Sequence, residues 1–369
     1  FCCVYAVAAA SWLVLRRAAV PLGAAIVIAV VLRGLFLFAE PKLSADVYRY
    51  LWDGREFASG RSPYARPPLD DARINHPEIP TIYPPHAELL FAVAHTLPLW
   101  RLLLMGCDVA LIVLMRRHRL AIATFPPLVF EGAWSGHVEV VAALLLAVAY
   151  LRDSGAAGGW AAGVKVIPLA ALPALVARSN SRTRFAITAA AAVIIPAIPF
   201  LIAGPLMPGM RDYATRWIFN SPAYDLVFAA VDRLAIKDAW TAIKDPLHLE
   251  RISDWVYRHV YSDFVTRAVL AVIAIVLIII AAKKKRVADS VGALLIVSPA
   301  IHPWYWLVAA PVAMLEGSRL YVALALCAPF SYLLYDGAPK WAVYALCYAV
   351  PLISLLRPSA SGSSGAGSR

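Results

Sequence analysis

The stretch AAVPLGAAIVIAVVLRGLFLF, residues 18–38, decides the fold. With a rise of about 1.5 Å per residue, a helix over this run is long enough to cross the apolar core of a bilayer. The rest of the chain has the same character, because 61% of its 369 residues are hydrophobic, only 15% are charged, and the mean hydropathy is +0.69. The composition therefore predicts an all-α polytopic membrane protein and excludes a soluble globular domain.

The positive charges show how the chain is threaded. The formal net charge is +11, and basic residues cluster in short loops between apolar runs, namely Arg16-Arg17, Arg116–Arg119, Arg178–Arg184 and Lys283–Arg286. Short basic loops mark the cytoplasmic side of a membrane, so we do not expect nucleic acid as a partner. The threading predicts about 11–13 transmembrane helices in the cytoplasmic (inner) membrane, with large extracytoplasmic loops at about 39–85 and 204–261. We expect one membrane domain over 1–357 and a disordered or added Ser/Gly-rich tail over 358–369.

The first large loop holds the stretch SADVYRYLWDGREFASGRSPYARPP, residues 44–68. Asp46, Arg49 and Asp53 recur at i, i+3 and i+7, so in a helix they share one face. With Ser44 as the predicted N-cap, Asp46 falls in the first turn, where the helix dipole favours an ionised carboxylate. Such a carboxylate with an arginine beside it suits a base that acts on a polar substrate; the alternative is an ordinary Asp–Arg pair on an interfacial helix.

Polar groups far apart in the sequence are all predicted at the outer ends of the spans. They are the segments 46–53, 83–86, 131–139 and 302–305, together with Lys165. Lys165 interrupts the apolar run 156–176, which is too short for two full crossings and predicts a broken or re-entrant pair. Its expected partner is an anion such as a lipid phosphate, and the alternative is an ion pair with Glu131 or Glu139. We expect one site at this face.

Other residues in these segments offer weaker signals. His302 precedes Pro303 and can donate to a phosphate oxygen, or it is an interfacial histidine beside Trp304 and Tyr305. The turn IYPPH, residues 82–86, supplies aromatic faces that suit sugar stacking or the membrane interface. Glu131, His137 and Glu139 lack metal-ligand spacing, and the sequence has no HExxH, GxGxxG, P-loop or GxSxG motif, so we expect no metal and no cofactor.

The residues 43–311 resemble the GT-C superfamily of membrane glycosyltransferases, and within it the polyprenyl-phosphate-mannose-dependent mannosyltransferases. The likeness is carried by DVYRYLWDG (46–54), YPPHAELLF (83–91), EGAWSGHVEVVAALLL (131–146), GVKVIPLAALPAL (163–175) and HPWYW (302–306). It implies a GT-C-like bundle with its active site at the extracytoplasmic face. It also implies inverting transfer of a sugar, with mannose expected, from a polyprenyl-phosphate donor to a lipid-linked or glycan acceptor among membrane lipids.

The resemblance also implies roles for single residues. Asp46 would be the catalytic base. The donor phosphate would be bound by Lys165, His302, Arg49 and Tyr305, and the acceptor or sugar by Asp53, Tyr83, His86, Glu131 and His137. Because the chain has Ser44-Ala45-Asp46 where many relatives have two acids, a metal is not expected there. Alternatives are a transporter or flippase of lipid-linked sugars, or the same chemistry with another sugar such as arabinose.

Overall fold

The computed structural model describes residues 1–69, 71–244, 246, 256 and 261–356, and the predicted tail at 358–369 lies outside them. This part of the chain is helical without a β-strand, apart from one isolated bridge between Phe219 and Ala300. The prediction of an all-α membrane protein is confirmed. By length and composition, three helices can cross a membrane: 97–114, 182–202 and 262–283. Shorter apolar helices accompany them at 2–15, 22–34, 167–178, 287–297, 303–315, 319–334 and 340–353.

The first half of the chain forms these elements: α1 Cys2–Leu15, α2 Leu22–Gly34, α3 Asp46–Ala58, α4 Pro85–Val93, α5 Leu97–Leu114, α6 Arg119–Ala123, the π-helix η2 Leu128–Trp134, α7 Glu139–Arg152, α8 Gly155–Val164, η3 Ile167–Ala171, α9 Leu172–Arg178 and α10 Arg182–Ile194. The second half forms α11 Ile198–Ala203, α12 Met210–Arg216, α13 Pro222–Arg233, α14 Ile236–Lys244, α16 Ser262–Lys283, α17 Val287–Val297, η5 Pro303–Tyr305, α18 Trp306–Leu315, α19 Arg319–Cys327, η6 Ala328–Leu334, α20 Lys340–Tyr344, η7 Ala345–Ala349 and α21 Val350–Leu356.

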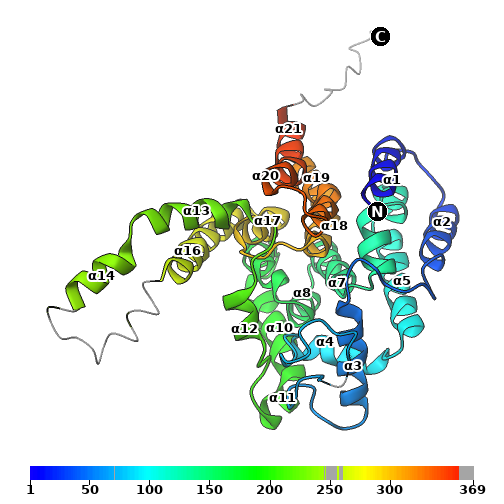
Figure 1. Ribbon diagram of the computed structural model, residues 1–369. Helices are drawn as coiled ribbons and strands as arrows, with labels where there is room; N and C mark the ends of the chain where they lie inside the picture. The colour runs from blue at the N-terminus through cyan, green and yellow to red at the C-terminus, as the bar shows by residue number, and fades with distance from the viewer. Residues whose placement is uncertain (70, 245, 247–255, 257–260, 357–369) are drawn as a thin grey trace.

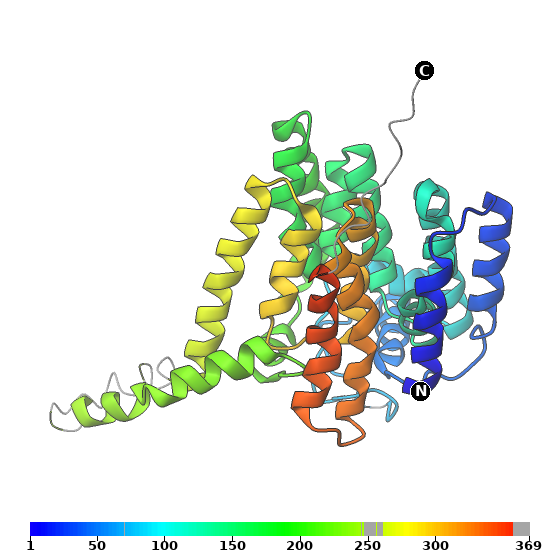
Figure 2. The same ribbon diagram turned by 90° about the horizontal axis from the view of Figure 1, so that it is seen from above.

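The long helices run side by side between two ends of a bundle (Figures 1 and 2). The basic turns after α1, α5, α9 and α16 lie together at one end. The N-terminus, the turn before α20 and the start of α13 lie at the other end (Figure 2). The charge pattern predicts this gathering of the basic turns at one end. The number of membrane crossings stays a prediction.

We call the end of the bundle that holds the N-terminus the polar end. Two interruptions in the helices lie near it. α8 ends at Lys165, whose extended backbone (φ −146°, ψ 145°) separates it from η3 and α9, so the predicted break in 156–176 is confirmed. The second interruption divides the apolar run 86–115 into two helices, α4 and α5. The chain leaves the helix at Ala94 and starts again after Thr96, with Pro98 in the first turn of α5, where its missing N–H costs no hydrogen bond.

The helix α3, which carries Asp46, packs closely on α4. A Cβ at Gly54 would lie 2.1 Å from the carbonyl oxygen of Phe91, so only glycine allows this approach of the two backbones. Tyr50 stacks on Phe91 with ring centroids 4.6 Å apart. Its hydroxyl accepts a hydrogen bond of 3.4 Å from Tyr83, and Tyr64 donates to the Tyr83 carbonyl at 2.8 Å. The two helices therefore form one packed unit.

The described part of the second predicted loop contains α12, α13 and α14. α13 and α14 project sideways from the bundle as an arm, away from the other helices (Figures 1 and 2). On the arm, Leu226 and Leu234 expose 73% and 69% of their surface. Such exposed apolar side chains are typical of helices that lie at a membrane interface.

Candidate functional site

A cavity of about 760 Å³ opens at the polar end. Its wall is built from the loop before α3, the loop 74–83, the break at Lys165, α12, the segment 302–305 and the turn after η6. Of the predicted site residues, Asp46, Arg49, Tyr83, Lys165, His302 and Tyr305 line it. Segments separated by more than two hundred residues thus meet at one site, as the sequence predicts.

Asp46 is the first residue of α3. The helix begins one residue later than expected, because Ala45 and not Ser44 is the N-cap; Ser44 still accepts a hydrogen bond of 3.3 Å from the Asp46 backbone N–H. The Asp46 side chain is 28% exposed. Burial raises the pKa of this carboxyl group from 3.8 to about 6, an effect that the nearby Lys165 partly opposes. A carboxyl group with such a pKa is ionised at neutral pH and can still accept a proton.

Lys165 forms the ion pair that was the alternative to a phosphate contact. Its Nζ lies 2.8 Å from Oε1 of Glu139, and the Glu139 side chain is fully buried. The same ammonium lies 4.8 Å from the ring centroid of Tyr83 and 5.2 Å from that of Tyr305. Because an ammonium has three N–H donors, the ion pair leaves Lys165 able to contact an anion in the cavity.

Arg49 and His302 offer further donors to the cavity. The Arg49 guanidinium donates to the His76 carbonyl at 3.0 Å, while its buried Nη1 has no hydrogen-bond partner among the residues that the structure describes. Burial, followed by the charge of Lys165, lowers the pKa of His302 to about 3, so its ring is neutral. Its buried Nδ1 is likewise without a partner in the described part of the chain. Tyr305 exchanges a hydrogen bond with Tyr213 of α12.

The predicted sugar-binding residues fall into three places. Tyr83 lines the cavity, while Glu131 and His137 lie fully buried beneath it. His137 Nδ1 is 3.9 Å from Oδ2 of Asp46, and its Nε2 is 3.7 Å from Oε2 of Glu131. The structure does not bring the other two residues to the cavity wall. Asp53 is fully buried on α3, and His86 contacts the Ala192 carbonyl at 2.7 Å.

Aromatic rings form a continuous stack along the floor and wall of the cavity. His137 stacks on Trp304 (centroids 3.9 Å apart), and Trp304 on His302 (4.6 Å). His302 stacks in turn on Phe219 (4.8 Å), and Phe219 on Tyr335 (5.2 Å). The sequence shows the aromatic content of HPWYW but gives no signal for Phe219 or Tyr335, because the stack exists only once the segment after α12, the segment 302–305 and the turn after η6 have met.

A second cavity of about 260 Å³ adjoins the first. Tyr83, Lys165 and Tyr305 line both cavities, so the ammonium of Lys165 stands at their boundary. The rest of the second cavity is mainly apolar and lies among η3, α12 and the end of α17 that faces the first cavity. The pair of cavities suits a ligand with a polar head and an apolar tail.

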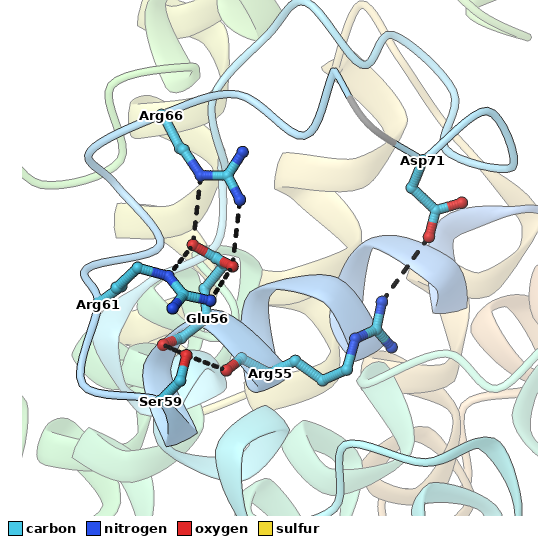
Figure 3. A network of polar contacts seen from close by, with 6 residues as sticks. All are labelled: Arg55, Glu56, Ser59, Arg61, Arg66 and Asp71. Carbon is cyan, nitrogen blue, oxygen red and sulfur yellow. Dashed lines mark hydrogen bonds and ion pairs between the residues drawn. The ribbon is translucent and has the colours of Figure 1, made fainter.

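The far end of α3 is built differently. Glu56, in the last turn, accepts hydrogen bonds from Arg61 at 2.9 and 2.7 Å and from Arg66 at 3.3 Å through both of its oxygens (Figure 3). Arg55 forms a longer ion pair of 3.7 Å with Asp71 (Figure 3). These contacts fasten the loop after α3 onto the helix, away from the cavity.

Within residues 1–69, 71–244, 246, 256 and 261–356, no group of three or more His, Cys, Asp or Glu side chains is arranged to hold a metal ion. The model of a protein family described as Glycosyltransferase family 87 matches residues 81–299, more than half of the chain. No curated protein and no solved structure matches the sequence.

Proposed function

The chain belongs to glycosyltransferase family 87, and from this membership we propose that it transfers a sugar from a polyprenyl-phosphate donor to a lipid-linked or glycan acceptor. Mannose is the sugar that we expect, and the anomeric configuration is inverted. The reaction takes place at the extracytoplasmic face of the cytoplasmic membrane. This placement is supported by the basic turns, which lie at one end of the bundle, while the N-terminus and the turn before α20 lie at the other end (Figure 2). Residues of that N-terminus and that turn line the cavity.

The observation that carries the proposal is the position of Asp46. It stands in the wall of the large cavity, partly exposed and close to the cations Arg49 and Lys165. Asp336 also lines this cavity, but it is an exposed residue of the turn after η6. Asp46 therefore has the surroundings that a general base needs: access to the substrate, and a pKa near the working pH.

The proposed reaction is a single displacement. The acceptor hydroxyl oxygen forms a bond to C1 of the donor sugar while its proton passes to the Asp46 carboxylate. The bond between C1 and the phosphate oxygen breaks, and its electron pair leaves on the phosphate. No second carboxylate acts as a nucleophile, which distinguishes the step from a double displacement with retention.

The leaving phosphate needs charge stabilisation rather than a proton. Lys165 and Arg49 supply positive charge, and the neutral ring of His302 supplies an N–H donor. We place the start of the lipid tail in the second cavity, because Lys165 and Tyr305 stand between this apolar space and Asp46.

The test is an assay with purified protein in lipid vesicles. Polyprenyl-phosphate mannose and polyprenyl-phosphate arabinose are each offered with a mixture of lipid acceptors, and the linkage of the product is analysed. We expect a new glycosidic bond of inverted configuration with the wild type and none with Asp46→Asn. Movement of the donor across the vesicle membrane without a new bond would instead identify a transporter of lipid-linked sugars.

A further inference from the structure

Beneath Asp46 lies a row of buried polar side chains that take no part in the displacement proposed above. His137 Nδ1 lies 3.9 Å from Oδ2 of Asp46, and its Nε2 lies 3.7 Å from Oε2 of Glu131, both longer than a hydrogen bond. The Tyr332 hydroxyl donates a hydrogen bond of 2.9 Å to the same Oε2 of Glu131. The side chains of His137 and Glu131 are both fully buried. Buried polar groups are normally paired, so the question is which atoms of this row carry the protons.

The backbone holds His137 under the base. Its N–H donates to the Glu131 carbonyl at 3.1 Å, which closes the loop after the π-helix η2. Gly136 (φ +79°) lets this loop pass α3 closely, since a Cβ there would meet Val47 at 3.0 Å. Trp100 donates to the Gly136 carbonyl at 2.7 Å. The position of the imidazole relative to Asp46 is thus set by the main chain.

With one negative charge shared among Asp46, His137 and Glu131, the charge can lie on either of the two carboxyl groups. In one form Asp46 is ionised, His137 carries its proton on Nδ1, and Glu131 is a neutral acid. In the other form Asp46 is protonated, His137 carries its proton on Nε2, and Glu131 is ionised. The two forms contain the same number of protons and differ only in where these lie. Only the first leaves Asp46 able to act as a base.

Burial selects the first form. Glu131 is fully buried, and the polar groups that it contacts are the Tyr332 hydroxyl and the neutral ring of His137, neither of which carries a positive charge. Asp46 is 28% exposed to the cavity and feels the charges of Lys165 and Arg49. An isolated buried charge is costly, so the charge resides on Asp46.

We propose that His137 is a positioning residue for the base. When substrate binds, the 3.9 Å gap between Nδ1 and Asp46 closes to a hydrogen bond that keeps the carboxylate ionised and oriented toward the acceptor. The 3.7 Å gap between neutral Glu131 and Nε2 closes likewise, and the proton of Glu131 fixes this tautomer. This inference rests on the proposed function, and it replaces the expected contact of His137 and Glu131 with sugar. The other groups that face His137 are Tyr50, whose hydroxyl is 3.5 Å from Nδ1, and the more distant Lys165 and His302.

The test separates hydrogen bonding from packing with two variants at one position. His137→Asn keeps an N–H donor near the place of Nδ1, whereas His137→Phe keeps a ring against Trp304 and removes the donor. If the hydrogen bond matters, His137→Phe lowers kcat about tenfold to a hundredfold at unchanged KM, because a hydrogen bond to a charged group is lost. The acidic limb of its pH profile also moves up by about one pH unit, since the carboxylate loses a donor. His137→Asn, which keeps the N–H donor, should retain most of the wild-type kcat and most of the wild-type pH profile.

Glu131→Gln is the matched second test, and it does not depend on the fold of the His137 variants. An amide donates to Nε2 as the neutral acid does, so we expect transfer within about twofold of the wild type. A large loss of transfer by Glu131→Gln would overturn the proposal. So would a wild-type rate for His137→Phe, or an active Phe variant beside an inactive Asn variant. A wild type that transfers no sugar in the same assay would refute the proposed function instead.

Discussion

The two ends of α3 carry carboxylates in opposite surroundings. Asp46, at the first residue, sits in the cavity wall, and burial raises its pKa to about 6. Glu56, in the last turn, is held by two arginines, and the hydrogen bonds from Arg61 lower its pKa to about 2, although burial opposes them. One short helix thus presents a carboxylate that can exchange a proton and another that cannot.

The comparison teaches that the number of donors around an acid separates a chemical role from a structural one. Glu56 accepts hydrogen bonds on both oxygens, and nothing remains for a substrate to satisfy. Asp46 faces open space, with a single imidazole at 3.9 Å behind it. The predictions below test this difference, beginning with the largest effect.

Asp46→Asn should lower the rate of transfer by about a hundredfold to ten-thousandfold, because the general base is lost. Donor affinity and the melting temperature should change little, since the amide has the size of the carboxyl group. Single-turnover transfer and donor binding, measured on one preparation, check both statements. Turnover near the wild-type rate would move the base to another acid, with Asp336 at the rim as the next to test.

Lys165→Ala should weaken donor binding about tenfold to a hundredfold, because a charge-assisted contact to phosphate contributes roughly 1.5–3 kcal/mol. It also leaves the buried carboxylate of Glu139 without its partner, so the melting temperature should fall as well. Lys165→Arg keeps the charge in a different geometry and should recover part of the binding.

The two effects at Lys165 are separated by the double variant Lys165→Ala/Glu139→Gln. It removes both charges of the pair and should regain stability without regaining donor affinity. A destabilised Lys165→Ala protein that binds donor normally would show that Lys165 serves structure alone.

The pH dependence should differ at the two ends of the helix. Transfer requires ionised Asp46, so its rate should fall by about tenfold per pH unit as the pH drops through about 6. The pKa of Glu56 is lowered on folding, so its contribution to stability is present above 4.5, its ordinary pKa, and is lost as the pH falls through about 2. At pH 5 the protein should therefore be slow yet folded, and activity should return on neutralisation. Irreversible loss at pH 5 would contradict this.

Glu56→Gln should have a small effect. It weakens the contacts with Arg61 and Arg66, whose side chains are 59% and 47% exposed, so we expect a modest fall in melting temperature. Transfer per folded molecule should be unchanged, because Glu56 does not line the cavity. A loss of transfer per folded molecule in Glu56→Gln would show that Glu56 also contributes to the reaction.

Chelation should have no effect on transfer. None of the three acidic residues of α3 belongs to a metal-binding group in the part of the chain that the structure describes. Loss of activity in EDTA that a divalent ion restores would show that substrate and protein together bind a metal at Asp46.

Much of this arrangement can be predicted from the sequence. Apolar runs and basic turns indicate the membrane helices and their alternation, because charge and hydropathy act locally. The convergence of Asp46, Lys165 and His302 follows from that alternation. The direction of each side chain does not follow, because it depends on contacts between distant segments. Asp53 shares a face with Asp46 in the sequence pattern, yet the packing of α4 on α3 buries it completely.

The roles of Glu131 and His137 were beyond sequence reasoning for the same reason. Both were expected to face the sugar, and their burial beneath Asp46 is produced by a π-helix and a glycine at positive φ, features that the residues EGAWSGH do not reveal. Tyr332, which donates a hydrogen bond to Glu131, lies 201 residues away from it in the sequence. Its contribution appears only when η6 packs against α1 and η5.

The close contact at Gly54 has a consequence for how substrates enter. Since α3 and α4 pack main chain to main chain there, Asp46 and Tyr83, which bracket that pair, belong to a single rigid body. A cavity of about 760 Å³ must nevertheless admit the proposed lipid-linked sugar and its acceptor. The break at Lys165 belongs to the same packed unit, because a Cβ at Gly163 would lie 2.2 Å from Nδ1 of His86 in α4. We therefore expect any widening to come from the wall that holds Tyr305, which lies in a short 3-10 turn. Asp46 would then keep its place while that wall moves.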